Sequence, residues 1–146
     1  MELVDALMPI IKVSIENAVE HGCDVGVVIK GIILGAFRSS DTVRQEAHKT
    51  IDHLVQLILK DSVNAGADPE VAVQAIIKGV IEIAREERLN EEEALSEAGT
   101  SVVLAAYTLG SDVESKVREV LSNDFAGHKV ELKEEYLKKQ KTERFS

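Results

Sequence analysis

Two residues of this chain have the types and the spacing of metal ligands. His48 and Asp52 lie four positions apart, so a helix would carry both side chains on one face, as two ligands of a divalent metal require. His53 projects about 100° further round such a helix and is not expected to join them. A His–Asp hydrogen bond at the edge of an apolar helix face is an equally ordinary use of this spacing, and we favour that structural interpretation. We therefore keep His48 and Asp52 as metal-ligand candidates and assign no catalytic or cofactor-binding residue.

A run of acidic residues offers a second possible chemistry. The run extends from Glu86 to Glu97 and holds Glu93 four positions before Glu97. Helical enzymes that bind Mg²⁺ place paired Glu-x-x-Glu and Glu-x-x-Asp motifs on facing helices, and di-iron bundles use Glu-x-x-His. Neither pattern is complete here, so we expect these carboxylates to cap and solvate a helix. The alternative is a small metal-dependent hydrolase that combines His48 and Asp52 with the acidic residues of the helix at 91–109.

The single cysteine carries less information. Cys23 precedes a helix start, where a thiolate would be stabilised, but no base of suitable type lies nearby except His21. Glycine-rich phosphate loops, zinc-finger spacings and Ser-His-Asp signatures are absent from the sequence. We therefore interpret Cys23 as a small loop residue.

Composition limits the classes of partner. The 146 residues carry a net charge of −9, 45% apolar residues and only 3% aromatic residues. Residues 1–127 hold 11 Lys and Arg against 22 Asp and Glu, a net charge of −11, whereas residues 128–146 hold 6 against 4, a net charge of +2. An acidic body repels nucleic acid and anionic lipid. With no apolar run long enough for a bilayer and an acidic start, we expect no membrane partner and a cytoplasmic location. We do not favour a nucleic-acid partner; a third interpretation is that the basic tail, 128–146, binds an acidic partner or nucleic acid.

The elements that must position these residues show an internal repeat. A shift of 44 residues superposes seven identical residues within positions 19–38, and a second shift of 44 reaches Gly110 and Asp112. The shared junction is Gly-x-Asp, at Gly22, Gly66 and Gly110. Glycine ends one helix in the left-handed conformation, and the following Asp caps the next helix. The period is similar to that of HEAT and armadillo repeats, an analogy of length alone.

Periodicity and capping signals predict an all-α protein. The expected helices span about 3–21, 25–38, 42–65, 69–88, 91–109 and 112–122. Pro9 predicts a kink or a true start near residue 8, Ser39-Ser40-Asp41 is the expected cap of the third helix, and Asn90 with Glu93 predicts a capping box. We expect one domain, 1–122, with repeat units at about 1–38, 42–88 and 91–122. A charged tail or helix, 123–146, would follow.

Two of the expected helices are apolar nearly all round, at 25–38 and 69–88. Such helices are normally buried, and both carry small residues four positions apart: Gly31 with Gly35, and Ala75 with Gly79. Glycine inside a helix costs up to about 1 kcal/mol relative to alanine, so a compensating contact is expected. We predict that the two helices cross backbone to backbone at these four residues, within a compact bundle rather than an open solenoid.

The apolar surface of the predicted helices favours a non-enzymatic role. Six short helices carry more apolar surface than they need for their own packing, and the run at 102–107 is a candidate contact surface. We expect a protein–protein interaction or assembly module that acts as a homo-oligomer. Its partner and stoichiometry do not follow from the sequence.

Overall fold

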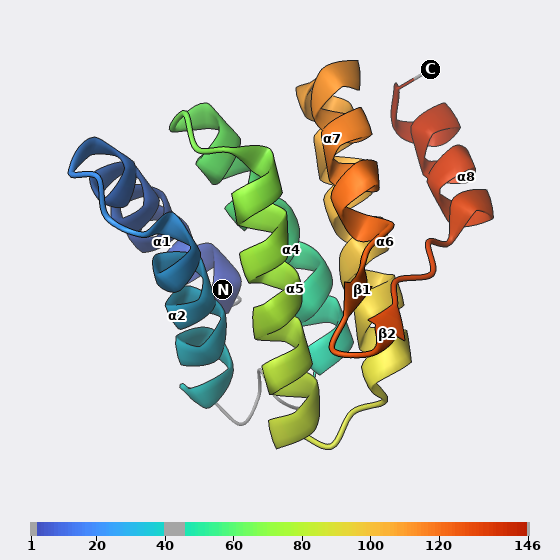
Figure 1. Cartoon of the computed structure of the whole chain (residues 1–146), viewed down its shortest axis with the longest axis horizontal. Helices are drawn as coiled ribbons and strands as arrows, with labels where there is room; N and C mark the ends of the chain where they lie inside the picture. Colours follow the sequence, from blue (N-terminus) through green and yellow to red (C-terminus); the bar gives the residue numbers. More distant parts are fainter. Residues whose placement is uncertain (1–2, 40–45, 146) are drawn as a thin grey trace.

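The computed structural model describes residues 3–39 and 46–145 (Figure 1). Seven helices and one short hairpin make up these residues. The helices are α1 (Leu3–Glu20), α2 (Val25–Arg38), α4 (Ala47–Asn64), α5 (Pro69–Glu86), α6 (Glu91–Leu109), α7 (Ser111–Leu121) and α8 (Glu134–Phe145), and the antiparallel strands are β1 (Asp124–Phe125) and β2 (His128–Lys129). The predicted all-α class is confirmed.

The helix junctions follow the local signals of the sequence. The carboxylates of Asp24 and Asp68 accept hydrogen bonds from the backbone N–H groups of Val27 and Glu70, and the Asn90 amide oxygen accepts one from Glu93. Gly22 and Gly66 end the preceding helices with φ of +68° and +93°. The predicted stops and starts at these junctions are confirmed, because each depends only on residues within one turn.

Three local predictions need correction or lie outside the described residues. At the third junction, Gly110 is itself the residue before α7 and no side chain caps that helix, so the expected cap by Asp112 does not form. Pro9 lies inside α1, which begins at Leu3 rather than near residue 8. The predicted cap at 39–41 falls largely outside the described residues, and Ser39 instead donates a hydrogen bond to the carbonyl of Ala36.

The helices form two layers, with parallel neighbours within each layer and antiparallel consecutive helices between the layers. Helices α2, α5 and α7 pack side by side in one layer, and α1, α4 and α6 pack side by side in the other (Figure 1). Each consecutive pair, α1 with α2, α4 with α5 and α6 with α7, spans the two layers. The pairs stack along the longest axis of the molecule, and α8 follows α6 at the far end.

The core lies between the layers and is centred on α5 and α6. Ten residues of α5 and eleven of α6 are buried, including the whole run 102–106. The sequence predicts the run 102–107 as a candidate contact surface, and this prediction is wrong for 102–106, whose side chains fill the space between the layers. Tyr107, the last residue of the run, is 37% exposed. Helix α2 buries only Ile29, Ile33, Ala36 and Phe37, so its expected burial on every side is wrong as well.

The predicted glycine crossing is corrected in its residues. Helices α2 and α5 do pack closely, but the contact is made by Ile33, whose side chain lies against Gly79, and by Gly26, which faces Ala75. A methyl group added at Gly31 or Gly35 would meet nothing within 4 Å. These two glycines therefore lie on the exposed side of α2. The four residues do not form one crossing.

The C-terminal segment closes the stack beyond α6. Residues 130–133 cross α6 at Gly99, where an added methyl group would overlap the Val130 side chain and lie 3.2 Å from Leu132 Cδ2. The backbone N–H of Lys133 donates to Thr100 Oγ1 at 3.0 Å. Leu137 anchors α8 with 1% of its surface exposed. The predicted charged tail or helix is thus a hairpin, an irregular crossing segment and a docked helix.

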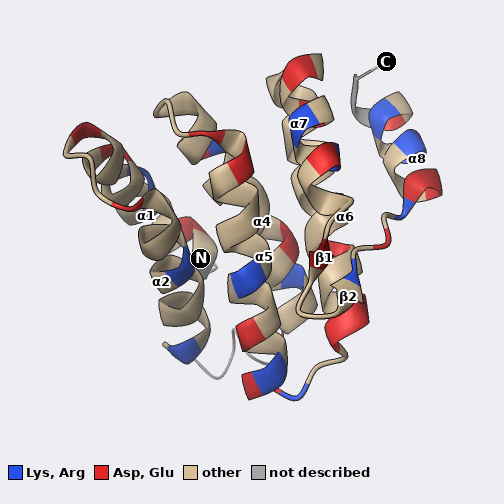
Figure 2. Cartoon of the chain, viewed as in Figure 1, with Lys and Arg blue, Asp and Glu red and all other residues tan. Residues whose placement is uncertain are grey.

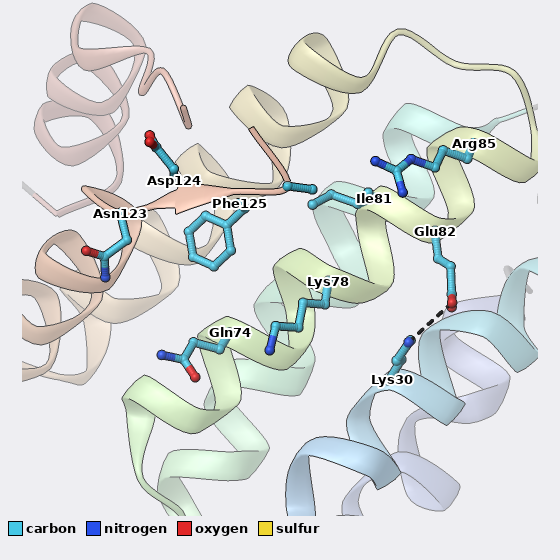
Figure 3. Close-up of a pocket in the computed structure, with 10 residues that line it drawn as sticks. Lys30, Gln74, Lys78, Ile81, Glu82, Arg85, Asn123, Asp124 and Phe125 are labelled. Atoms are coloured by element: carbon cyan, nitrogen blue, oxygen red, sulfur yellow. Dashed lines mark ion pairs between the residues drawn. The ribbon is translucent and has the colours of Figure 1, made fainter. Parts of the chain in front are cut away.

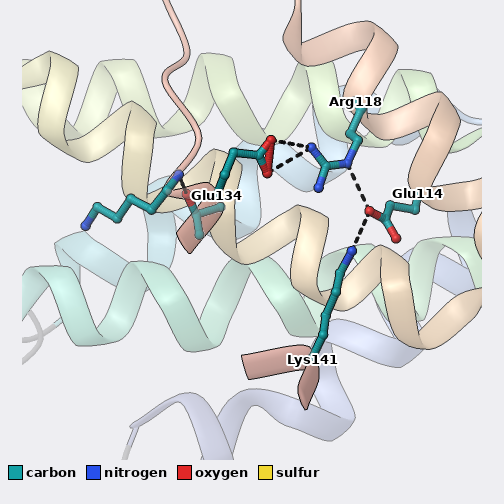
Figure 4. A network of polar contacts seen from close by, with 6 residues as sticks. Glu114, Arg118, Glu134 and Lys141 are labelled. Atoms are coloured by element: carbon teal, nitrogen blue, oxygen red, sulfur yellow. Dashed lines mark hydrogen bonds and ion pairs between the residues drawn. The ribbon is translucent and has the colours of Figure 1, made fainter. Parts of the chain in front are cut away.

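A chain of ion pairs fixes α8 to α7. The Arg118 guanidinium contacts both Glu114 and Glu134 at 2.9 Å, and Lys141 Nζ lies 2.8 Å from Glu114 (Figure 4). Burial alone would raise the pKa of Glu114, but the hydrogen bonds from Lys141 and Arg118 outweigh it and the net pKa is lowered. Lys141 also lies 4.6 Å from the centre of the Tyr107 ring. The polar helix α8 is therefore held by charges around one apolar anchor.

Candidate functional sites

A polar pocket lies where α4 and α6 cross beneath the C-terminal segment. Its volume is about 320 Å³, and its lining residues are Asp52, Glu97, Thr100, Ser101, Lys133 and Tyr136. Ser101 Oγ donates to Asp52 Oδ1 at 2.5 Å, and Gln56 Nε2 donates to the same oxygen at 3.0 Å. His48 Nδ1 lies 2.6 Å from Glu97 Oε2. The pocket therefore gathers carboxylates, hydroxyls and an amine from three segments distant in sequence.

Glu97 is the residue whose ionisation this environment changes most clearly. Burial raises its pKa, partly offset by the hydrogen bond to His48 and by the charges of His48 and Lys133, and Asp52 raises it further. A carboxyl group of this kind retains its proton to higher pH than an exposed one. Such a carboxyl group can donate a hydrogen bond to a polar ligand or take part in proton transfer.

The structure brings together part of the predicted hydrolase constellation. Asp52 and Glu97 share the pocket, and His48 contacts Glu97 rather than Asp52. Glu93 is exposed at the start of α6. Glu91 lies outside the pocket and forms an ion pair with Arg85, with 2.7 Å between Oε1 and Nε. Among residues 3–39 and 46–145, no three His, Cys, Asp or Glu side chains are grouped as metal ligands. The predicted acidic cluster of α6 is thus divided between the exposed start of the helix, an ion pair and the pocket.

Cys23 lies at the other end of the molecule. It is exposed and lines a shallow apolar pocket between α1 and α2 together with His21, Ala18 and Val28. His21 Nδ1 donates a hydrogen bond to the carbonyl oxygen of Asn17, 2.9 Å away, so its ring is engaged with its own helix. Nothing in this arrangement turns the thiol toward a base.

A larger groove runs across the outer face of the α2–α5–α7 layer. Its main cavity, about 490 Å³, lies between α5, α2 and the β-hairpin, and a second cavity of about 290 Å³ continues between α2 and α5 (Figure 3). The two cavities share Lys30, Gln74 and Lys78. Ile81 and Phe125 form the apolar floor at one end, and Val71 and Val27 line the other, where Val27 is 67% exposed.

Most charges of the groove are already neutralised. Lys30 Nζ lies 3.2 Å from Glu82, and Arg85 pairs with Glu91 at 2.7 Å. Lys78 is exposed and forms no hydrogen bond or ion pair with any residue that the structure describes. Figure 3 shows Gln74 and Lys78 extending from α5 toward the same side as Asn123 and Phe125. The accessible chemistry of this groove is therefore the Lys78 amine, the exposed Asp124 carboxylate at its hairpin side, two amides and apolar surface.

Sequence reasoning did not identify the groove. Lys78 and Gln74 sit four positions apart on α5, a spacing that signals one shared helix face. The other wall comes from Asn123 and Phe125, which belong to the segment predicted as a tail. These residues follow directly from the end of α7, and the turn at Ala126–Gly127, with φ of +52° and +84°, pairs β2 with β1. Gly127 was the available signal for this hairpin.

Comparison of the chain with protein-family models, with curated proteins and with solved structures finds no match. Among the described residues, no helix is both long enough and apolar enough to cross a bilayer.

Proposed function

We propose that this protein is a protein–protein interaction module whose ligand is an extended peptide segment of a partner, bound in the groove across α2, α5 and the β-hairpin. The observation that carries this proposal is the combination of an elongated groove with one unpaired lysine, Lys78, at the point shared by both cavities. Stacked helix pairs create such extended surfaces because neighbouring pairs contribute parallel helices to one face.

The lining indicates the chemistry of the peptide. The Lys78 amine would bind a carboxylate side chain of the peptide, since a charge-assisted hydrogen bond is stronger than a neutral one. The Gln74 and Asn123 amides can donate to and accept from a peptide backbone. Ile81 and Phe125 offer apolar contact next to these groups. The expected ligand is therefore an extended segment with an acidic side chain followed by apolar ones.

The polar pocket supports the hydrolase alternative less well. Ser101 is only 4% exposed and its hydroxyl is committed to Asp52, which also accepts from Gln56. Glu97 is committed to His48. These groups satisfy one another across the α4–α6 crossing, as buried polar groups in a helix interface must. We assign them a structural role.

The test is binding of synthetic peptides, followed by fluorescence anisotropy. A set of short labelled peptides would pair apolar residues with acidic, basic or neutral ones, and the acidic–apolar members are expected to bind. Lys78→Glu should weaken that binding at least about tenfold, because it replaces the one free attraction by repulsion. Lys116→Glu is the matched control, since Lys116 is exposed on α7 outside the groove. If acidic–apolar peptides do not bind, or if both variants lose affinity equally, the proposal fails.

A further inference from the structure

The β-hairpin presents a free strand edge to the groove. On its hairpin side the main cavity is lined by residues 123–126, which belong to β1 and to the residues on either side of it, and by neither residue of β2, although the structure describes both strands. Figure 1 shows the same arrangement, with β1 on the side of the hairpin that faces α5 and β2 on the far side. An edge strand carries backbone N–H and C=O groups that no neighbouring strand satisfies.

The turn determines which backbone groups point to this edge. Residues 126–127 both have positive φ, +52° and +84°, as a two-residue type I′ turn requires. The residues that flank such a turn exchange their backbone hydrogen bonds, so Phe125 is bonded to His128. The next pair, Asp124 with Lys129, is the non-hydrogen-bonded one. The backbone N–H and C=O groups of Asp124 therefore point away from β2 and toward the groove.

These two groups of Asp124 have no other partner. Neither its N–H nor its C=O forms a hydrogen bond with any residue that the structure describes. The preceding residue, Asn123, donates its N–H to the carbonyl of Val120 at 3.1 Å, so its donor is already used. One backbone donor and one backbone acceptor therefore lie together at the rim of the groove.

We infer that the partner peptide binds by strand addition: it lies between β1 and α5 as a third, antiparallel strand and exchanges backbone hydrogen bonds with Asp124. This inference rests on the proposed peptide groove and specifies how the groove is used. An antiparallel pair is the arrangement in which a single peptide residue makes both bonds with Asp124. The Gln74 amide on the α5 side of the same cavity can bond the outer edge of the added strand.

The pleat determines which peptide side chains face the protein. Phe125 is 8% exposed and forms the floor of the groove with Ile81, so the side chain of Asp124 lies on the opposite face of the strand. The peptide residue paired with Asp124 shares that outer face, and the residues before and after it point to the floor. The ligand should therefore carry two apolar residues with one residue between them. That middle residue should not be acidic, because it lies beside the Asp124 carboxylate.

A second copy of this chain fits the same edge poorly. In a two-fold symmetric pairing of two β1 edges, the two Asp124 residues would lie directly opposite each other. Like charges in that position are destabilising. The net charge of −9 on each chain adds to the repulsion. A peptide without an acidic residue at the paired position avoids this cost.

The test is amide hydrogen exchange of the full chain, followed by NMR, with and without a synthetic peptide of the pattern acidic–apolar–threonine–apolar. At saturating peptide the Asp124 amide should exchange at least about tenfold more slowly, because a strand hydrogen bond protects it. The Lys129 amide is the matched control, since it also points outward but from the opposite edge of the hairpin. Equal protection of the two amides, or no change at Asp124 with a peptide that binds, would overturn the inference. Protection of Asp124 without peptide that rises with protein concentration would show a second copy at the edge and would overturn it too.

Backbone methylation of the peptide gives an independent readout. An N-methyl group on the threonine removes the donor to the Asp124 carbonyl and should weaken binding at least about tenfold in fluorescence anisotropy. An N-methyl group on the next residue, whose N–H points away from β1, is the control and should weaken binding less. Equal losses would contradict strand addition. If no peptide of the set binds, the proposed function fails as well, whereas Lys78-dependent binding without protection of Asp124 removes strand addition alone.

Discussion

Replacing Gly99 by alanine tests the way the C-terminal segment is held on the bundle. Two effects oppose each other at this position. Alanine stabilises a helix interior by up to about 1 kcal/mol relative to glycine. Against this, the new methyl group would overlap Val130 Cγ1 and press on Leu132 Cδ2 at 3.2 Å. Overpacking of this kind costs about 1–3 kcal/mol. The net expectation is a loss of about 1 kcal/mol.

The matched control is Gly31→Ala, which makes the identical substitution in a helix with no neighbour within 4 Å. The helix-propensity gain is common to both variants, so the difference between them isolates the overlap, about 1–3 kcal/mol. Urea denaturation at low protein concentration measures both free energies of unfolding, and low concentration excludes a contribution from self-association. Gly31→Ala should be more stable than the wild type, and Gly99→Ala less stable.

Truncating the opposing side chain completes the cycle. In a Val130→Ala background the Gly99→Ala penalty should largely disappear, because the overlapping Cγ1 atom is gone. An interaction free energy of about 1–3 kcal/mol between the two substitutions is expected. If Gly99→Ala stabilises the protein as much as Gly31→Ala does, the segment does not cross α6 where the structure places it.

Two further variants examine the charged and apolar anchors. The pKa of Asp61 is raised by burial first, with Lys12 lowering it and Glu16 raising it, and its Oδ2 atom is buried without a hydrogen-bond partner among the described residues. Because the pKa of Asp61 is raised in the folded state, folding stability is lost as the pH rises through that pKa. Asp61→Asn should therefore increase the melting temperature at pH 7 and have little effect near pH 3, below the ordinary carboxyl pKa of about 4. An equal increase at both pH values would contradict the burial of this charge. Leu137→Ala removes the buried anchor of α8 and should weaken its docking by about 2–5 kcal/mol. Amide hydrogen exchange should then accelerate in residues 134–145 while α4 and α5 keep their protection, whereas a uniform loss of protection would show that α8 is not a separate unit.

The local parts of the fold could be predicted because they depend on neighbours in sequence. The caps at Asp24, Asp68 and Asn90 each involve a backbone N–H group two or three positions away. Helix ends at these junctions therefore agree with the sequence expectation to within about two residues, whereas the expected start of the third helix at 42 lies outside the described residues and α4 begins at Ala47. The third junction differs because Gly110 adopts φ of +131° and leads directly into α7.

The orientation of α2 could not be predicted, since a helix that is apolar all round carries no periodic signal for its buried face. The choice is made by shape: Ile33 fills the space above Gly79, which turns Gly31 and Gly35 outward. The sites were missed for a related reason. Asp52 meets Ser101 across 49 positions of sequence, and the groove needs the hairpin to return over α5. Neither contact can be predicted from the spacing of residues along the chain.

Because the helix pairs stack side by side, each pair is stabilised mainly by its contacts with the adjacent pair. The α4–α5 pair is flanked on both sides, whereas the α1–α2 pair has its principal contacts with α4 and α5 alone. In such a one-dimensional arrangement the interface terms add along the row, and the unit with one neighbour separates at the smallest free-energy cost. Thermal fraying therefore starts at α1 and α2 and travels toward α6, so this edge sets how readily a protease gains access to an otherwise intact chain.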